Sequence, residues 1–199
     1  MVPETVAQEP LIRLENLNKS FVLADGGRFD AVRDVSLTVN RGDALGLIGR
    51  SGAGKSTLLR LMNLLERPDS GRVFVSGQEL TALGKAQLRD ARQKIGMIFQ
   101  QFNLVPSLSL EDNVLLPCHF SAVRRQRAGS NPRATARELL QALELPADAW
   151  QRPVTGLSVG QQQRAAVARA LIGRPELLIA DEPTSALDSR NRDRLLSLL

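Results

Sequence analysis

The sequence predicts an α/β fold in which helices flank a mostly parallel β-sheet. Three short apolar runs, residues 44–48, 95–99 and 177–181, have the length and composition of buried parallel strands. Segments with helical periodicity lie between them. With 199 residues, 43% of them hydrophobic, the chain is long enough to bury a sizeable core, and we expect one domain carrying an inserted lobe.

Residues 1–99 are expected to hold a small antiparallel β-subdomain and the first part of the core. The runs 11–17 and 34–39 alternate between apolar and polar residues as strands do, and residues 24–27 between them favour a turn. Residues 72–75 predict another strand. The run 44–48 leads directly into a glycine-rich segment, which predicts a strand followed by a tight loop.

Residues 100–160 are expected to form a helical lobe. Ser109 is a plausible cap for a helix that ends at Pro117, and Asn131 for a second helix. Residues 161–199 return to the core, with a helix capped by Ser158 and the apolar strand 177–181.

The glycine-rich segment matches G-x-x-x-x-G-K-[ST], the pattern of a phosphate-binding P-loop. Glycine lets the backbone curl around phosphates, while Lys55 supplies a point charge to them and the Ser56 hydroxyl can ligate Mg²⁺. The start of the following helix adds a positive dipole end. The predicted nucleotide-binding residues of this loop are Gly49, Ser51, Gly52, Ala53, Gly54, Lys55, Ser56 and Thr57.

Two carboxylates stand at the end of the strand 177–181. A parallel strand delivers the side chains at its carboxyl end to the ligand-binding edge of the sheet. Asp181 is therefore expected to hold Mg²⁺, and Glu182 to polarise an attacking water as general base.

A third motif, Leu157-Ser158-Val159-Gly160-Gln161, precedes these carboxylates. With all three motifs the chain resembles ATP-binding-cassette ATPases, the nucleotide-binding subunits of ABC transporters. The resemblance covers nearly the whole chain and includes residues 185–188 as the D-loop. It implies a P-loop NTPase core, with ATP and Mg²⁺ as cofactors.

The resemblance also assigns roles to further residues. Gln100 matches the Q-loop glutamine, which contacts Mg²⁺ or the attacking water, and Phe21 stands where the family stacks an aromatic ring on adenine. Lys55, Gln100 and Glu182 are the implied catalytic residues. Ser158, Gly160, Gln161 and Asp188 are implied to complete the nucleotide site of a second copy in a head-to-tail homodimer.

The sequence departs from the family pattern in two places. Val159 replaces a glycine of the signature, which we expect to be tolerated because Ser158 and Gly160 remain. The chain also ends at Leu199 without the histidine that the family places on a later strand. We therefore expect the last core strands to be missing, and ATP binding with impaired turnover for this 199-residue segment.

Several segments before Leu104 resemble methionine-importer ATPases, whereas later ones are nearer to lipoprotein-release and macrolide-export ATPases. The resemblance thus implies an ATPase that powers transport together with a membrane permease, with import of a small nutrient such as an amino acid favoured. An exporter-type ATPase and a non-transport cassette ATPase remain alternatives.

Composition favours a cytoplasmic protein, and the resemblance implies that it lies peripherally on the inner face of the cell membrane. The start of the chain has no secretory pattern, no apolar run is long enough to span a bilayer, and the single cysteine excludes an internal disulfide. The net charge of +5 suits an anionic partner. Nucleic-acid binding through Arg124, Arg125 and Arg127 is not favoured, because a solvated face, or one that faces lipid headgroups, explains that run equally well.

Overall fold

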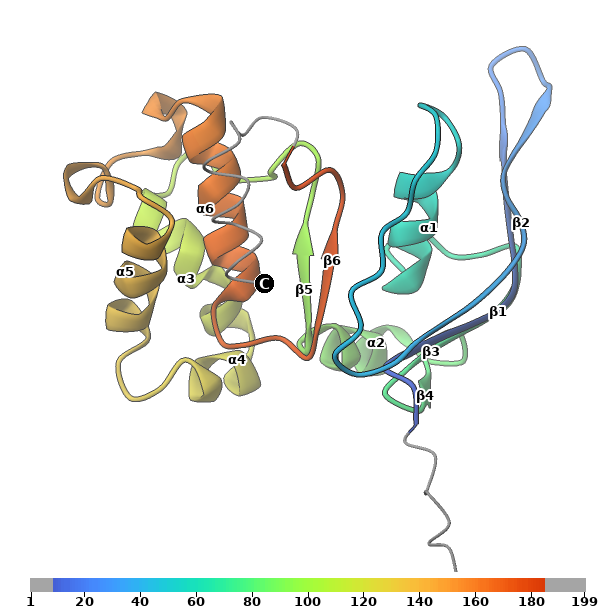
Figure 1. Ribbon diagram of the computed structural model, residues 1–199, viewed down its shortest axis with the longest axis horizontal. Helices are drawn as coiled ribbons and strands as arrows, with labels where there is room; N and C mark the ends of the chain where they lie inside the picture. The colour runs from blue at the N-terminus through green and yellow to red at the C-terminus, as the bar shows by residue number, and fades with distance from the viewer. Residues whose placement is uncertain (1–8, 185–199) are drawn as a thin grey trace, which may run out of the picture. The chain divides into compact units, whose positions relative to one another are not determined.

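The structure is a computed structural model that describes residues 9–184. These residues fall into two compact units, divided between Ala91 and Arg92, and each is described by itself (Figure 1). We refer to them as the first and the second unit.

The first unit is built on a four-stranded antiparallel sheet in the order β2-β1-β3-β4. Strands β1 (Ile12–Val22) and β2 (Arg28–Val39) form a long hairpin, visible in blue in Figure 1. β3 (Ser70–Val75) pairs with the other edge of β1, and the short β4 (Gln78–Glu79) pairs with β3. The predicted antiparallel β-subdomain is therefore confirmed, with strands longer than their apolar alternation indicated.

One face of this sheet is covered by apolar side chains. Ile12, Leu14 and Leu17 of β1 are buried, and Leu61 and Met62 at the end of α1 (Lys55–Met62) are buried as well. The helix α2 (Lys85–Arg92) buries Leu88. Burial of a leucine side chain contributes roughly 1.5–3 kcal/mol, so this layer is the main stabilising element of the unit.

The predicted strand at residues 44–48 is wrong for the described structure. Residues 43–50 have no regular secondary structure, and the side chains of Leu45 and Ile48 are exposed. A β-strand requires main-chain hydrogen bonds to a neighbouring strand, and the apolar composition of a segment does not show which strand that would be. The segment therefore reaches the glycine loop as irregular chain.

The second unit combines a parallel strand pair with four α-helices. β5 (Ile95–Ile98) and β6 (Leu177–Ala180) run parallel, with Ile95 opposite Leu177 and Ile98 opposite Ala180. The helices are α3 (Leu110–Phe120), α4 (Ala122–Arg127), α5 (Pro132–Ala142) and α6 (Val159–Leu171). Two short 3₁₀ turns, η1 (Ala147–Ala149) and η2 (Val154–Gly156), connect α5 to α6.

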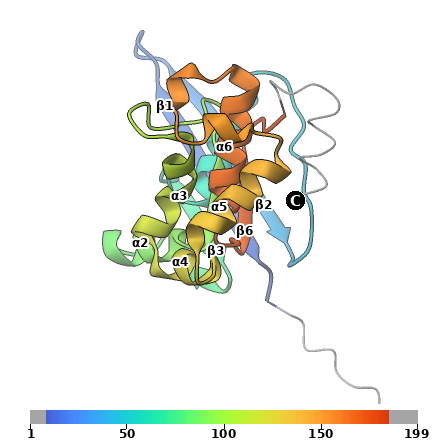
Figure 2. The same cartoon turned by 90° about the vertical axis from the view of Figure 1, so that its left-hand side faces the viewer.

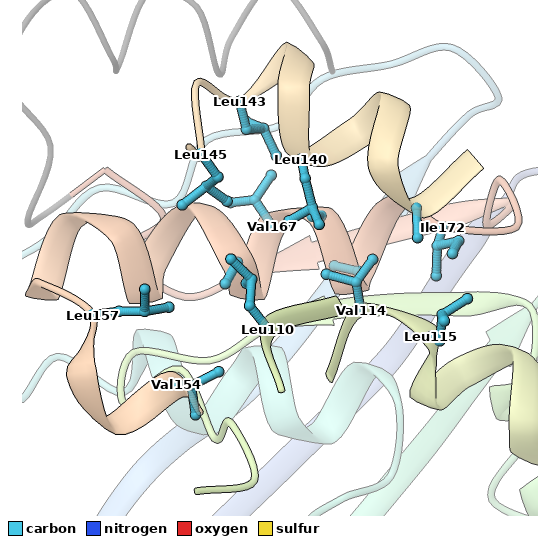
Figure 3. Close-up of a cluster of buried hydrophobic side chains, with 14 of the residues drawn as sticks. Leu110, Val114, Leu115, Leu140, Leu143, Leu145, Val154, Leu157, Val167 and Ile172 are labelled. Atoms are coloured by element: carbon cyan, nitrogen blue, oxygen red, sulfur yellow. The ribbon is translucent and has the colours of Figure 1, made fainter. Parts of the chain in front are cut away.

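The core of the second unit lies where α3, α5 and α6 meet (Figures 1 and 2). Figure 3 shows Leu110 and Val114 of α3, Leu140 of α5 and Val167 of α6 converging there. α6 contributes mainly alanines to this core, so the neighbouring helices α3 and α5 can approach its backbone closely.

The predicted helix caps are present, but the predicted end of α3 is wrong. Ser109 and Asn131 each accept a hydrogen bond from a main-chain N–H of the following helix. α3 continues past Pro117 to Phe120. Proline removes one main-chain donor, and the burial of Val114, Leu115 and Cys118 around it keeps the last turn helical.

The α/β fold class is thus confirmed, with an antiparallel sheet, a parallel pair and flanking helices. Within residues 9–184, no helix combines the length and the apolar character needed to cross a membrane.

Candidate nucleotide-binding site

The glycine loop curls tightly at the start of α1. Gly52 and Gly54 have φ angles of +78° and +83°, which side chains other than glycine rarely adopt. The Ala53 N–H donates to the Arg50 carbonyl at 3.2 Å, which closes a turn inside the loop. Gly54 also lies directly against β2, since a Cβ on it would stand 2.0 Å from the Ala31 carbonyl oxygen.

The lysine of the loop is held by the loop itself. The Lys55 ammonium donates to the carbonyls of Gly49 at 2.8 Å and Arg50 at 2.9 Å. Its long side chain therefore folds back over residues 49–54 instead of extending away from them. Ser56 and Thr57 follow in the first turn of α1, where main-chain N–H groups and the helix dipole favour an anion.

These features fit a polyphosphate bound with a divalent cation. The loop offers left-handed glycines, a lysine ammonium and a helix N-terminus, and no acidic side chain stands in the first turn of α1. Ser56 and Asp181 carry oxygen donors, the ligand type that Mg²⁺ prefers. Among residues 9–184, no group of three or more His, Cys, Asp or Glu side chains could hold a metal ion.

Phe21 lies near the end of β1, opposite Phe29 on β2. The Lys19 ammonium stands 5.3 Å from the centroid of the Phe21 ring, within the range of a cation–π contact. Glu66 anchors Lys19 there at 2.8 Å, and its carboxylate, followed by that of Asp69, raises the pKa of Lys19. The ring is half-buried, so it retains surface for stacking.

In the second unit, the structure brings together the predicted Q-loop glutamine and the predicted general base. The Gln100 side-chain amide donates to the Glu182 carboxylate at 3.3 Å. Both residues follow the carboxyl ends of neighbouring parallel strands, since Gln100 comes after β5 and Glu182 after β6. Asp181 is buried, and its N–H donates to the Ile98 carbonyl at 2.9 Å, which extends the strand pairing by one bond.

Glu182 has an unusual backbone conformation with a φ of +51°. For a residue other than glycine such a conformation costs about 1–3 kcal/mol and is concentrated at functional sites. Its carbonyl accepts a hydrogen bond at 3.3 Å from the side chain of Gln163, which is almost fully buried on α6. This hydrogen bond therefore ties the main chain of Glu182, the predicted base, to α6.

The sequence analysis missed Gln163. A signal for it exists, because Gln163 stands in line with Ala166, Val167 and Ala170 on the buried face of α6. A polar residue in an apolar stripe requires a hydrogen-bond partner.

The signature motif begins α6 with a complete capping box. The Ser158 hydroxyl accepts a hydrogen bond from the Gln161 N–H, and the Gln161 side chain accepts one from the Ser158 N–H. Gly160 lies in the first turn. Val159 is exposed, so its extra side chain displaces nothing inside this unit.

The predicted site residues are divided between the two units. The glycine loop and Phe21 belong to the first unit, whereas Gln100, the signature and the two carboxylates belong to the second. Asp188 and the rest of the predicted D-loop lie outside the described residues.

The arginines of the run 124–127 do not form a continuous exposed patch. The Arg124 guanidinium is buried and donates to the carbonyls of Gln93, Ile95, Ala170 and Ile172. Arg127 pairs with Glu176 at 2.7 Å. Arg125 is exposed.

A profile of the ABC transporter family matches residues 32–185. The chain belongs to this family. It is 47% identical over 191 residues to the methionine import ATP-binding protein MetN of Cupriavidus metallidurans, covering 95% of this chain and 53% of that protein. The MetN 2 protein of Rhodopseudomonas palustris is 48% identical over 201 residues, covering 98% of this chain and 50% of the relative.

The chain spans about half the length of the curated relatives it matches. Among solved structures, it is similar to a dimeric post-hydrolysis state of the ATP-binding cassette MJ0796 bound to ADP and phosphate. That match has a TM-score of 0.85 at 35% identity and covers 94% of this chain and 80% of the other. The resemblance to cassette ATPases and to methionine-importer ATPases is confirmed.

Proposed function

We propose that this chain is the ATP-binding and ATP-hydrolysing part of an ABC importer for methionine or a closely similar small nutrient. The observation that carries the proposal is the hydrogen bond between Gln100 and Glu182 just after the carboxyl ends of β5 and β6. The same chain belongs to the ABC transporter family and has a complete phosphate-loop motif. The cargo rests on relatives at 46–48% identity that are named methionine import proteins.

The residues divide the chemistry between them. Gly49, Ser51, Gly52, Ala53 and Gly54 supply main-chain donors around the phosphates, and Lys55 exchanges its bonds to the loop carbonyls for phosphate oxygens. Ser56, Asp181 and Gln100 would hold Mg²⁺, which neutralises phosphate charge when it is bound. Thr57 adds a hydroxyl in the same helical turn.

Glu182 orients and polarises the attacking water, and Gln100 fixes the position of its carboxylate. Phe21 stacks on the adenine ring. Ser158, Gly160, Gln161 and Asp188 complete the site of a second copy in a head-to-tail homodimer, in line with the dimeric cassette to which the chain is similar. The dimer works with an integral membrane permease on the inner face of the cell membrane.

The test is reconstitution of the protein with a candidate permease in vesicles, followed by uptake of labelled methionine. We expect uptake that requires ATP and Mg²⁺. The Glu182→Gln variant should bind ATP and lose hydrolysis by about 10²-fold or more. Lys55→Ala should lose ATP binding. Glu138→Gln removes an exposed carboxylate of α5 and serves as the matched control with unchanged rate.

ATP hydrolysis coupled to the release or export of lipoprotein or macrolide cargo, without methionine uptake, would replace the importer by the exporter-type alternative. Hydrolysis that survives Glu182→Gln unchanged would overturn the assignment of the general base.

A further inference from the structure

The loop between β5 and α3, residues 99–109, follows an unusual path directly after Gln100. Phe102 and Asn103 have φ angles of +58° and +50°. Two consecutive left-handed residues that are not glycine are energetically costly and persist only where surrounding contacts enforce them. The Phe102 N–H donates to the Phe99 carbonyl at 3.0 Å, and the Asn103 N–H to the Gln101 carbonyl at 2.6 Å, so the chain turns tightly around Gln100.

The enforcing contact comes from α6. The Arg169 guanidinium donates one N–H to the Asn103 carbonyl at 2.6 Å and another to the Phe102 carbonyl at 2.5 Å. The planar guanidinium presents two N–H donors in a fixed fork that fits these two successive carbonyls, whereas a lysine ammonium at this position would lack both the fork and its reach. Burial lowers the pKa of Arg169 below its ordinary value.

The far end of the same loop is held from α3. The buried Asn113 side chain accepts from the Val105 N–H at 2.7 Å and donates to the carbonyls of Val105 and Ser109 at 3.0 Å. α3 and α6 pack directly against each other. The loop is therefore fastened at two points to one pair of helices, and the point next to Gln100 is the one made by Arg169.

We propose that Arg169 is a positioning residue, which locks the Phe102–Asn103 turn to α6 and thereby holds Gln100 against Glu182. The same helix begins at the signature residues Ser158 and Gly160 and supports the Glu182 carbonyl through Gln163. The Q-loop glutamine, the general base and the signature thus share one rigid support. The expected effect of Arg169 on ATP hydrolysis rests on the proposed function, whereas its expected effect on the stability of the β5–α3 loop does not.

The structural consequence is tested by amide hydrogen exchange on the peptide that covers residues 99–105. Arg169→Lys, which keeps the charge but not the fork, should speed exchange in this peptide about tenfold. Arg169→Met, which removes both donors, should have a larger effect. Arg125→Lys, on an exposed arginine of α4, is the matched control and should leave the peptide unchanged.

A rescue experiment separates positioning from general stability. Asn103→Gly relieves the left-handed strain at an exposed side chain, so adding it to Arg169→Lys should return exchange to within about threefold of the original chain. Glu144→Gly makes the same change at another exposed left-handed residue, with φ of +53°, and should not rescue this peptide. Equal rescue by both glycines would overturn the proposal, because it would indicate a purely global effect.

The catalytic consequence is tested by steady-state ATP hydrolysis. Arg169→Lys should lower kcat about tenfold with little change in KM for ATP, because Arg169 contacts the loop that carries Gln100, a residue proposed to act in hydrolysis. A change in KM alone would overturn it. If the unsubstituted protein neither binds nor hydrolyses ATP, the proposed function fails while the exchange result still decides the role of Arg169.

Discussion

In the first unit, the functional loop is held by its own backbone; in the second unit, it is held by side chains from helices behind it. Residues 49–55 rely on left-handed glycines and on a lysine that bonds to carbonyls of the same loop. The β5–α3 loop is fastened instead by Asn113 and Arg169. The two arrangements serve different tasks.

A loop that wraps phosphate with its own N–H groups has no room for side chains inside its curve. A loop that presents one side chain, such as Gln100, has its main chain free to be fixed from the opposite side. The second unit uses this device repeatedly, with Arg124, Asn113, Gln163 and Arg169 each donating to main-chain carbonyls. We therefore expect it to be sensitive to loss of buried polar groups, and the first unit to added Cβ atoms.

The largest effect is expected for Arg124→Met. The substitution leaves the carbonyls of Gln93, Ile95, Ala170 and Ile172 without their donor inside the protein, which should lower the free energy of unfolding by about 3–5 kcal/mol. Urea denaturation followed by circular dichroism measures it. Arg125→Met is the control, and equal losses in both variants would show that the buried donors are not what matters.

A smaller loss is expected for Gly54→Ala in the first unit. Its new Cβ meets the Ala31 carbonyl oxygen and its φ of +83° strains an alanine, so we expect a loss of about 3 kcal/mol together with weakened nucleotide binding. Gly52→Ala has a similar φ but open space around the added atom, and should cost only about 1 kcal/mol. Thermal unfolding and titration with labelled ATP compare the two; a Gly52 variant as damaged as the Gly54 variant would refute the role of β2.

Ser158→Ala should cost about 1 kcal/mol of stability, because it breaks the capping box at the start of α6. Ser158→Asp keeps an acceptor at the cap and should retain most of the stability. Under the proposed function both variants should lose hydrolysis, since the hydroxyl is assigned to a partner's nucleotide site. Full hydrolysis by Ser158→Ala would argue against that assignment.

The smallest effect concerns Asp69 beside β1. The N–H of Ser20, followed by the Ser20 hydroxyl and Lys19, lowers the pKa of Asp69 below its ordinary value of 3.8. Because the folded-state pKa is depressed, this stabilisation is complete above the unfolded-state pKa and is lost as the pH falls through the folded-state value. Asp69→Asn should therefore flatten the decline of the melting temperature below about pH 4. A slope identical to that of the original chain would contradict it.

The sequence predicted most of what local chemistry decides. The glycine loop, the caps at Ser109, Asn131 and Ser158, and the strand ending at Asp181 all follow from short-range patterns. The strand at 44–48 and the helix end at Pro117 were wrong, because pairing partners and packing lie far away in the chain. The buried position of Arg124 was not predicted, since a charged residue in a basic run carries no local sign that four distant carbonyls will surround it.

The helix α6 carries the capping box at Ser158, the Gln163 bond to Glu182 and the Arg169 bonds to the β5–α3 loop. α6 has 13 residues, a length of roughly 20 Å, and its inner face is lined by alanines with almost no exposed surface. At these alanines there is no long side chain that could move aside, so we expect that enlarging Ala165 or Ala168 would displace the helix. Substitutions at alanines that take no part in the chemistry should then disturb the signature, Glu182 and Gln100 together. The substitutions that α6 tolerates should therefore be limited by whichever of these three site elements is most sensitive to its position.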